Sequence, residues 1–250
     1  MQTTGNTILI TGAGTGMGLE AAKQFSQRGN RIIMVARNQD RLQAEAALLE
    51  NASVFACDIA DRRQVDRLLR YLTESHPDLN VIFLNAGVTH TYSLFSDQDA
   101  FEHAQEEMTV NYLSAVRLTQ QLEPRLSQMP EAAMIITTSG AAMAPDISNP
   151  TYSATKAALH SLVQSMRLVL ERRNSTIKVF ELMAPLVDSP FAKAIHSDHK
   201  VPPAEVIAAL LTGLEADELE MHPGAAEDVY QLMRTSPEQA LQAVNAITNA

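Results

Sequence analysis

Short apolar runs recur along most of the chain, separated by segments whose apolar residues are three or four positions apart. Most of the runs are rich in Ile, Val or Phe, and their shortness is typical of buried strands in a parallel sheet. Strands are therefore predicted at Thr7–Ile10, Arg31–Val35, Ser53–Ala56, Val81–Leu84, Met134–Thr137 and Lys178–Leu182.

The segments between these runs have the spacing of amphipathic helices. Gly29 stands where a C-terminal cap belongs, and Pro150 where a first helical residue belongs. Alternation of strand and helix predicts βαβ units with right-handed crossovers. The fold class is therefore α/β: a single-domain, Rossmann-type, doubly wound parallel sheet flanked by helices, with ligands at the carboxyl ends of the strands. The predicted helices are Gly18–Arg28, Gln39–Leu49, Arg62–Glu74, Asp97–Gln128 and Pro150–Arg173.

The last quarter of the chain is less regular. Its pattern predicts a helix over Pro203–Glu215, a short strand at Leu219–Met221 and a helical stretch over Ala225–Thr248 with a break near Pro237. Within one domain spanning residues 1–250, we expect a small substrate loop and helix region over about 186–217. A helical C-terminal tail follows over about 224–250, and the sequence leaves its role open.

Composition excludes several classes of protein. The chain has 250 residues, a formal net charge of −10 and one cysteine, Cys57. A lone cysteine forms no internal disulfide and no Cys-based metal site, and a reducing, cytoplasmic location fits it best. No apolar run approaches the roughly 18 residues of a membrane span, and the N-terminus lacks the pattern of a signal peptide. The acidic balance argues against nucleic-acid binding, which needs a positive surface.

A glycine-rich turn follows the first predicted strand and precedes a helix, with the sequence Thr11-Gly12-Ala13-Gly14-Thr15-Gly16-Met17-Gly18. Glycines let a backbone approach a pyrophosphate closely, and a helix N-terminus offers unpaired N–H groups. The usual Gly-x-Gly-x-x-Gly fingerprint fails here. The pattern Thr-Gly-x-x-x-Gly-x-Gly does fit, and it resembles the cofactor turn of the short-chain dehydrogenase/reductase family. The resemblance implies that the cofactor-binding residues of this turn are Thr11, Gly12, Thr15, Gly16, Met17 and Gly18.

The end of the second strand bears on the choice of dinucleotide. An enzyme that prefers NAD usually carries Asp or Glu there, to bind the ribose 2′-hydroxyl. Here Ala36 stands in that place and Arg37 follows it. A guanidinium suits a 2′-phosphate through charge and paired donors, and the alternative is that Arg37 is a solvated surface residue. We expect NADP(H) to be preferred, with NAD(H) possible as a cofactor.

Two further strand ends match the same family. Asp58 and Ile59 follow the third strand and resemble its adenine-contacting residues. Asn85, Ala86 and Gly87 follow the fourth strand and are similar to the Asn-Ala-Gly element that lines the cofactor groove. Each motif alone is a routine turn. Their order and their positions at strand ends make them informative.

The candidate catalytic residues are Ser139, Tyr152, Lys156 and Asn111. Tyr152 and Lys156 are four positions apart, so on a helix they share a face. An ammonium group favours the phenolate, so we expect Lys156 to lower the pKa of Tyr152 from about 10. Ser139 precedes Tyr152 by thirteen residues, a separation typical of the family, and Asn111 lies in the preceding long helix.

The family resemblance implies a division of roles among these four residues. Tyr152 donates a proton to the carbonyl oxygen of a small-molecule carbonyl substrate or removes one from an alcohol. Ser139 hydrogen-bonds the same oxygen and stabilises its developing charge. Lys156 binds the nicotinamide ribose and tunes Tyr152, and Asn111 supports a water-linked proton path. The nicotinamide supplies the hydride chemistry.

One segment departs from the family pattern. The family carries Pro-Gly-x-Val-x-Thr after the sixth strand, whereas this chain has Ala184-Pro185-Leu186-Val187-Asp188-Ser189. Pro185, Val187 and Ser189 are still expected to lie beside the cofactor, but proline restricts φ where glycine is free. This variant, together with His222-Pro223-Gly224, resembles a DltE-like subgroup.

The favoured function is an NADPH-dependent oxidoreductase acting on a carbonyl or a secondary alcohol. A non-catalytic NADP(H)-binding sensor or regulator is the first alternative, and sugar-nucleotide epimerisation is the second. The presence of Ser139, Tyr152 and Lys156 favours an enzyme, and epimerases usually have longer chains. In the family, helices equivalent to Asp97–Gln128 and Pro150–Arg173 pack between subunits, so a homodimer or homotetramer is expected.

Overall fold

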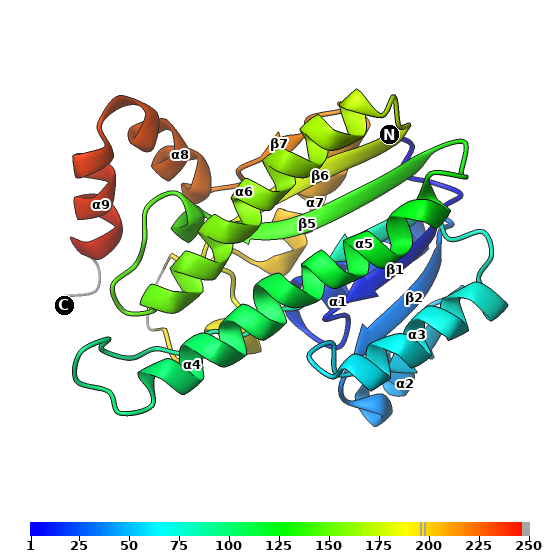
Figure 1. Cartoon of the computed structure of the whole chain (residues 1–250), viewed down its shortest axis with the longest axis horizontal. Coiled ribbons are helices and arrows are strands. Elements are labelled where there is room, and N and C mark those ends of the chain that lie inside the picture. Colours follow the sequence, from blue (N-terminus) through cyan, green and yellow to red (C-terminus); the bar gives the residue numbers. More distant parts are fainter. Residues whose placement is uncertain (196, 198, 247–250) are drawn as a thin grey trace.

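The protein is built on one sheet of parallel strands in the order β3-β2-β1-β4-β5-β6-β7, seen in a computed structural model that describes residues 1–195, 197 and 199–246 (Figure 1). The chain runs outward from β1 to β3, then returns to add β4 beside β1 and continues to β7. The strand order therefore reverses between β1 and β4, where doubly wound sheets bind their ligands. The strands are β1 Thr7–Thr11, β2 Arg31–Ala36, β3 Ala52–Ala56, β4 Val81–Leu84, β5 Ala132–Ser139, β6 Ile177–Ala184 and β7 Glu220–Met221.

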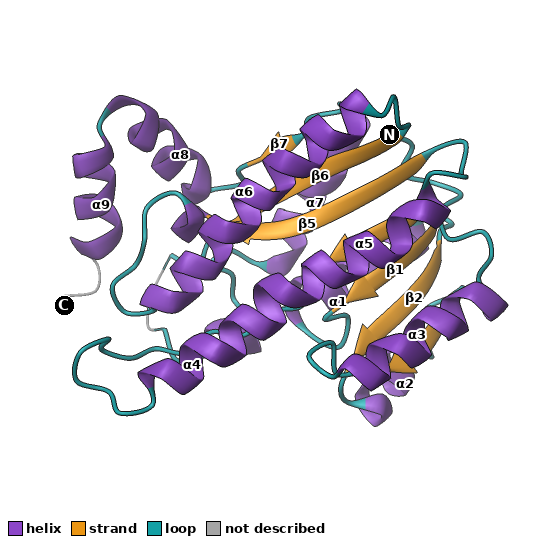
Figure 2. Ribbon diagram, in the orientation of Figure 1, coloured by secondary structure: helices purple, strands orange, loops and turns teal. Residues whose placement is uncertain are grey.

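Helices cover both faces of this sheet (Figure 2). Alternate strand residues pack on opposite faces: Ile8 and Ile10 lie in the core under α1, α2 and α7, whereas Leu9 lies in the core under α3, α5 and α6. Both faces are thus apolar, as the continuous hydrophobic runs predict. The helices are α1 Gly16–Gln27, α2 Gln39–Ala46, α3 Arg62–Ser75, α4 Ala100–Glu107, α5 Ser114–Leu126, α6 Pro150–Arg172, α7 Pro203–Glu215, α8 Ala225–Thr235 and α9 Pro237–Ala246.

The predicted α/β class, the parallel sheet and all six main strands are confirmed. The single long helix predicted over Asp97–Gln128 is wrong. It begins later, at Ala100, and a π-helical stretch, η1 (Met108–Leu113), separates α4 from α5. A π turn holds one extra residue per turn, and periodicity over a long window does not register it. Asn111 lies within this stretch.

The C-terminal segment forms two helices, α8 and α9, which project beyond the sheet in Figure 1. The predicted break near Pro237 is confirmed, because Pro237 is the first residue of α9. The predicted end of the tail at Thr248 lies outside the described residues. None of the helices described is long and apolar enough to cross a membrane.

Candidate active site

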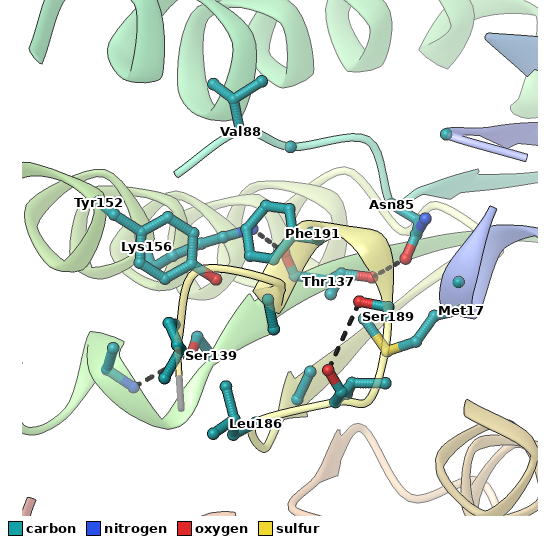
Figure 3. A pocket seen from close by; sticks show the side chains of 18 of the residues that line it. Met17, Asn85, Val88, Thr137, Ser139, Tyr152, Lys156, Leu186, Ser189 and Phe191 are labelled. Atoms are coloured by element: carbon teal, nitrogen blue, oxygen red, sulfur yellow. Dashed lines mark hydrogen bonds between the residues drawn. The ribbon is translucent and has the colours of Figure 1, made fainter. Parts of the chain in front are cut away.

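A cavity of about 760 Å³ opens at the carboxyl ends of the strands. Figure 3 shows it with Met17 and Ser189 on one side and Ser139, Tyr152 and Lys156 on the other. Thr11, Gly18 and Asn111 do not line it. The predicted site residues that do line it are Gly12, Thr15, Gly16, Met17, Arg37, Asp58, Ile59, Asn85, Ala86, Gly87, Ser139, Tyr152, Lys156, Pro185, Val187 and Ser189.

The glycine-rich turn needs its glycines for two physical reasons. Gly12 and Gly16 have φ values of +70° and +54°, a backbone conformation that side-chain-bearing residues rarely adopt. Gly18 begins the buried part of α1, and a Cβ there would lie 2.2 Å from the carbonyl oxygen of Gly12. The turn is therefore folded tightly onto the first turn of α1. At Gly12, Gly14 and Gly16 its outer surface forms a cradle in the cavity, where the backbone can approach a pyrophosphate closely.

Thr11 joins the two strands at the reversal of strand order. Its hydroxyl accepts hydrogen bonds from the backbone N–H groups of Asn85 and Ala86, at 3.0 and 3.1 Å. The Asn85 side-chain amide donates to the carbonyl oxygen of Thr11, and its oxygen accepts from Thr137 on β5. Thr11 and Asn85 thus fix the ends of β1, β4 and β5 relative to one another, and this shapes the floor of the cavity.

Two guanidinium groups lie at the end of β2. Arg37 is exposed and lines the cavity, as expected, and Arg41 lines it as well. Arg41 is in the first turn of α2, where its backbone N–H donates to the side chain of Asn38. Its Cδ lies 3.8 Å from the position of a Cβ on Gly14, beside the glycine-rich turn. Sequence reasoning missed Arg41, although its position four residues after Arg37 was a usable signal.

Tyr152 and Lys156 reach into the cavity from α6 (Figure 3). The Lys156 Nζ lies 5.6 Å from the centroid of the Tyr152 ring and donates to the carbonyl oxygen of Thr137 at 2.8 Å. Ser139 ends β5, and its Oγ accepts from the backbone N–H of Ala141 at 3.2 Å. The Phe191 ring packs against the Tyr152 ring, with the two ring centroids 5.7 Å apart. The three predicted catalytic residues beside the cavity are thus brought together.

The expected direction of the Tyr152 pKa is wrong for the protein alone. Burial raises the pKa of Tyr152 to about 12, hydrogen bonding with Ser139 opposes the rise, and the charge of Glu107 adds to it. Burial also lowers the pKa of Lys156 to about 8, while the carboxylate of Glu181 acts against that fall. Desolvation is therefore the largest influence on the pKa of both groups. Tyr152 is a protonated donor near neutral pH.

Asn111 does not line the cavity, and its side chain links two segments behind the cavity wall. Its Oδ1 accepts from the backbone N–H of Val88 at 2.8 Å, and its amide donates to the Val88 carbonyl and to the Thr155 hydroxyl. It therefore ties the loop after β4 to α6 at Thr155, which lies between Tyr152 and Lys156 in the sequence. Its predicted part in a proton path stays a prediction.

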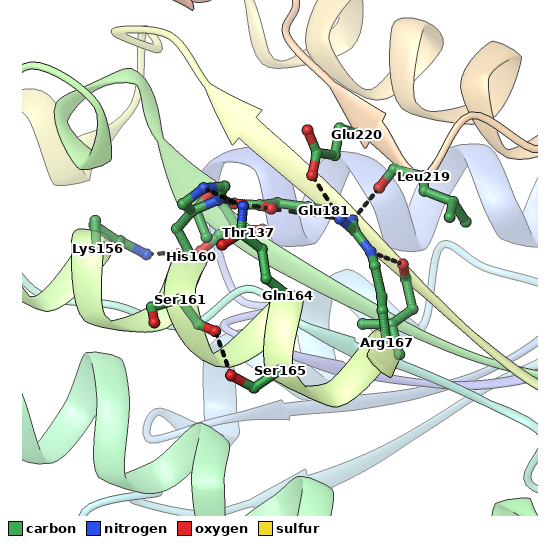
Figure 4. A network of polar contacts seen from close by, with 12 residues as sticks. Thr137, Lys156, His160, Ser161, Gln164, Ser165, Arg167, Glu181, Leu219 and Glu220 are labelled. Atoms are coloured by element: carbon green, nitrogen blue, oxygen red, sulfur yellow. Dashed lines mark hydrogen bonds and ion pairs between the residues drawn. The ribbon is translucent and has the colours of Figure 1, made fainter. Parts of the chain in front are cut away.

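A buried polar network lies behind Lys156 (Figure 4). Glu181, in the middle of β6, has no solvent exposure, and it accepts from the Thr138 hydroxyl at 2.6 Å and contacts His160. Arg167 lies on its far side and pairs with Glu220 at 2.6 Å. Sequence reasoning missed this network. A glutamate inside an apolar strand was the signal that pointed to it.

The sequence comparisons agree with this geometry. The family model for short chain dehydrogenases matches residues 6–200. An uncharacterized oxidoreductase, DltE, from Bacillus subtilis is 38% identical over 196 residues, covering 76% of this chain and 74% of that protein. A fatty acyl-CoA reductase from Acinetobacter baylyi is 31% identical over 190 residues, covering 74% of this chain and 64% of that protein. The chain belongs to the short-chain dehydrogenase family of NAD(P)-dependent oxidoreductases.

Solved structures share the whole fold. A short chain dehydrogenase from Burkholderia cenocepacia, in complex with NADP, superposes with a TM-score of 0.84 at 25% identity, covering 97% of this chain and 98% of that one. A bulky-bulky ketone specific alcohol dehydrogenase from Comamonas testosteroni has a TM-score of 0.79 at 23% identity, covering 96% and 94%. The similarity to the Comamonas testosteroni enzyme supports the shared fold and says nothing about a shared substrate.

Proposed function

We propose that this protein is an NADPH-dependent oxidoreductase that transfers hydride between the nicotinamide and a carbonyl or secondary alcohol. One observation carries the proposal: Ser139, Tyr152 and Lys156 line the same cavity as the glycine-rich turn. A proton donor, an oxygen-binding hydroxyl and a dinucleotide cradle therefore share one site. A sensor without turnover needs the cradle alone.

The residues along the cavity fit an extended dinucleotide. The cradle at Gly12, Gly14 and Gly16 suits the pyrophosphate, Gly18 lets the turn pack tightly on α1 behind it, and the start of α1 offers N–H groups to the phosphates. Asp58 and Ile59 would hold the adenine. Asn85, Ala86, Gly87, Pro185, Val187 and Ser189 would hold the nicotinamide half. When bound, this cofactor supplies the hydride.

NADP(H) is the preferred cofactor in this proposal. Arg37 and Arg41 both line the cavity at the end of β2, so two guanidinium groups are available to one 2′-phosphate. The NADP complex of the Burkholderia cenocepacia relative supports this choice. NAD(H) remains a weaker cofactor, because the cradle itself is common to both dinucleotides.

The side chains define the proton chemistry of the reductive direction. Tyr152, protonated at neutral pH, donates to the substrate carbonyl oxygen, and Ser139 stabilises the negative charge that develops there. Lys156, held by the Thr137 carbonyl, positions the cofactor ribose and restores the proton on Tyr152. Asn111 holds the loop and α6 in place around them, at the start of the path by which that proton returns from solvent.

We further propose a homodimer or homotetramer, because apolar side chains are exposed on α4–α6, among them Phe101 (73% exposed) and Leu168 (56% exposed). A buried free thiol at Cys57 supports a reducing, cytoplasmic location.

The test of the catalytic proposal is turnover of a panel of ketones, aldehydes and secondary alcohols with NADPH or NADP, in the wild type and in Tyr152→Phe. We expect oxidation of NADPH by some carbonyl compounds and a loss of about 10²- to 10⁴-fold in the variant. NADPH binding without turnover of any panel member would favour the sensor instead.

A further inference from the structure

One wall of the cavity comes from the last two helices of the chain. Ala225, Ala226 and Val229 of α8 and Ala243 and Val244 of α9 all line it. These helices follow the last strand and lie beyond the sheet (Figure 1). These five lining side chains are small and apolar, so they form no hydrogen bonds to a ligand.

This wall stands beside Ser139 and not beside the nucleotide cradle. A Cβ on Gly140, the residue after Ser139, would lie 3.8 Å from the Cα of Ala226. At α9, the Asn245 amide donates to the Pro145 carbonyl at 3.0 Å, and its oxygen accepts from the backbone N–H of Ile147 at 2.8 Å. Both helices are thus fixed to the segment that joins Ser139 to Tyr152. A group bound against them is bound next to the proton donor.

The charges that line this part of the cavity are negative. Asp146 precedes α6 and Asp228 lies on α8, and both line the cavity. Among the lining residues that the structure describes, the basic side chains other than the imidazole of His199 are Arg37 and Arg41, at the end of β2, and Lys156. An anionic substrate group next to α8 would therefore share this part of the cavity with the carboxylates of Asp146 and Asp228.

We propose that α8 and α9 form the substrate-binding wall, and that the substrate is an uncharged ketone or aldehyde whose apolar arm lies against Val229 and Val244. Asp146 and Asp228 disfavour substrates whose arm ends in an anion, including thioesters of phosphate-bearing carriers. The inference rests on the proposed reductase function and names its substrate class. The tail thereby takes the place of a long covering loop in excluding water from the reacting carbonyl.

Three carbonyl compounds test this proposal with NADPH: octyl methyl ketone, the same ketone with a terminal carboxylate, and acetone. We expect the wild type to prefer octyl methyl ketone over its carboxylate by about tenfold or more in kcat/KM. Each carboxylate that faces the anion at short range in water contributes about fivefold. High salt should narrow this preference, because it screens exposed charges.

Substitutions separate the two parts of the proposal. Val229→Ala and Val244→Ala should each lower kcat/KM for octyl methyl ketone relative to acetone by about 4- to 15-fold, since each substitution removes two methyl groups and one buried methylene contributes about fourfold. Asp146→Asn and Asp228→Asn should each raise the rate with the carboxylate by about fivefold. The matched controls are Leu241→Ala and Glu238→Gln, which change α9 outside the cavity and should leave all ratios at wild-type values.

The outcomes distinguish this inference from the function on which it rests. Equal kcat/KM for octyl methyl ketone and its carboxylate, or ratios unmoved by the valine and aspartate variants, would overturn the substrate assignment while NADPH-dependent reduction stands. Failure to reduce any carbonyl would overturn both. NADPH affinity, measured by fluorescence titration, should be the same in all these variants, which shows that each one is folded.

Discussion

The imidazole of His160 lies against the carboxylate of Glu181, with Nδ1 2.9 Å from one oxygen and 3.0 Å from the other. The carboxylate has no solvent exposure, and its hydrogen bond raises the pKa of His160. His160 is one helical turn beyond Lys156, whose ammonium group the Glu181 charge also favours. A buried anion thus stands behind the one lysine of the catalytic group. A buried carboxylate is costly without such partners.

The first prediction concerns the pH dependence of the wild type. Burial lowers the pKa of Lys156 to about 8, so the lysine is charged below that pH and neutral above it. Tyr152, with a pKa raised to about 12 by burial, stays protonated throughout this range. The kcat/KM for carbonyl reduction should therefore fall as the pH rises through about 8. A profile that stays flat well above pH 8 would contradict the role given to Lys156.

The second prediction is that Glu181→Gln moves this fall in activity to lower pH. The substitution removes a charge that raises the Lys156 pKa but keeps an oxygen to accept from Thr138 and His160. A merely structural role would lower the rate without moving the profile. The control is Glu220→Gln, which removes a carboxylate paired with Arg167 in the same network. Its pH profile should match the wild type, and a shift as large as that of Glu181→Gln would count against the specific role of Glu181.

The third prediction is that Gly18→Ala destabilises the protein, whereas Gly14→Ala has a small effect. A Cβ on Gly18 would lie 2.2 Å from the Gly12 carbonyl oxygen, but a Cβ on Gly14 would meet its nearest neighbour, the Cβ of Ala36, at an ordinary 3.5 Å. Overpacking of this kind costs about 1–3 kcal/mol. Urea unfolding without cofactor measures both variants. Equal free energies of unfolding for the two would show that the turn is looser than described.

The fourth prediction concerns cofactor choice. Replacing Arg37 by Asp should weaken NADPH use by about 10- to 100-fold in kcat/KM, since a hydrogen bond to a charged group contributes about 1.5–3 kcal/mol. NADH use should improve, because the carboxylate suits a ribose 2′-hydroxyl. Arg172→Ala, an exposed arginine in the last turn of α6, serves as the control and should change neither value. Equal kcat/KM of the wild type with NADPH and NADH would contradict the inference that Arg37 selects NADPH.

The sheet could be predicted from the sequence because each strand carries its own local signal. A buried parallel strand is apolar on both faces, and Ile8, Leu9 and Ile10 show this in three consecutive residues. The spacing from Tyr152 to Lys156 is likewise a local helical relationship, and it survives intact in α6. The glycine-rich turn and the Tyr152–Lys156 pair share one cavity because the carboxyl ends of β1, β4 and β5 meet at one edge of the sheet.

The features that were not predicted depend on contacts between distant segments. The pKa of Tyr152 is set by burial under neighbours such as Phe191, which comes from a loop 39 residues later in the chain (191 − 152 = 39). Glu181 meets His160 only because α6 packs over β6. The Asn245 contacts join α9 to the segment between Ser139 and Tyr152, about 100 residues earlier in the chain, and no local pattern encodes them.

The central claim is that hydride moves from NADPH to a carbonyl carbon in the cavity that Tyr152 lines. The most direct measurement supplies NADPH deuterated at the transferring position of nicotinamide C4, with a ketone that the wild type reduces, and locates the label in the product by mass spectrometry. The proposed function predicts one deuterium on the carbinol carbon for each NADPH consumed, and almost no labelled product with Tyr152→Phe. Product without label, or labelled product formed equally fast by Tyr152→Phe, would contradict it.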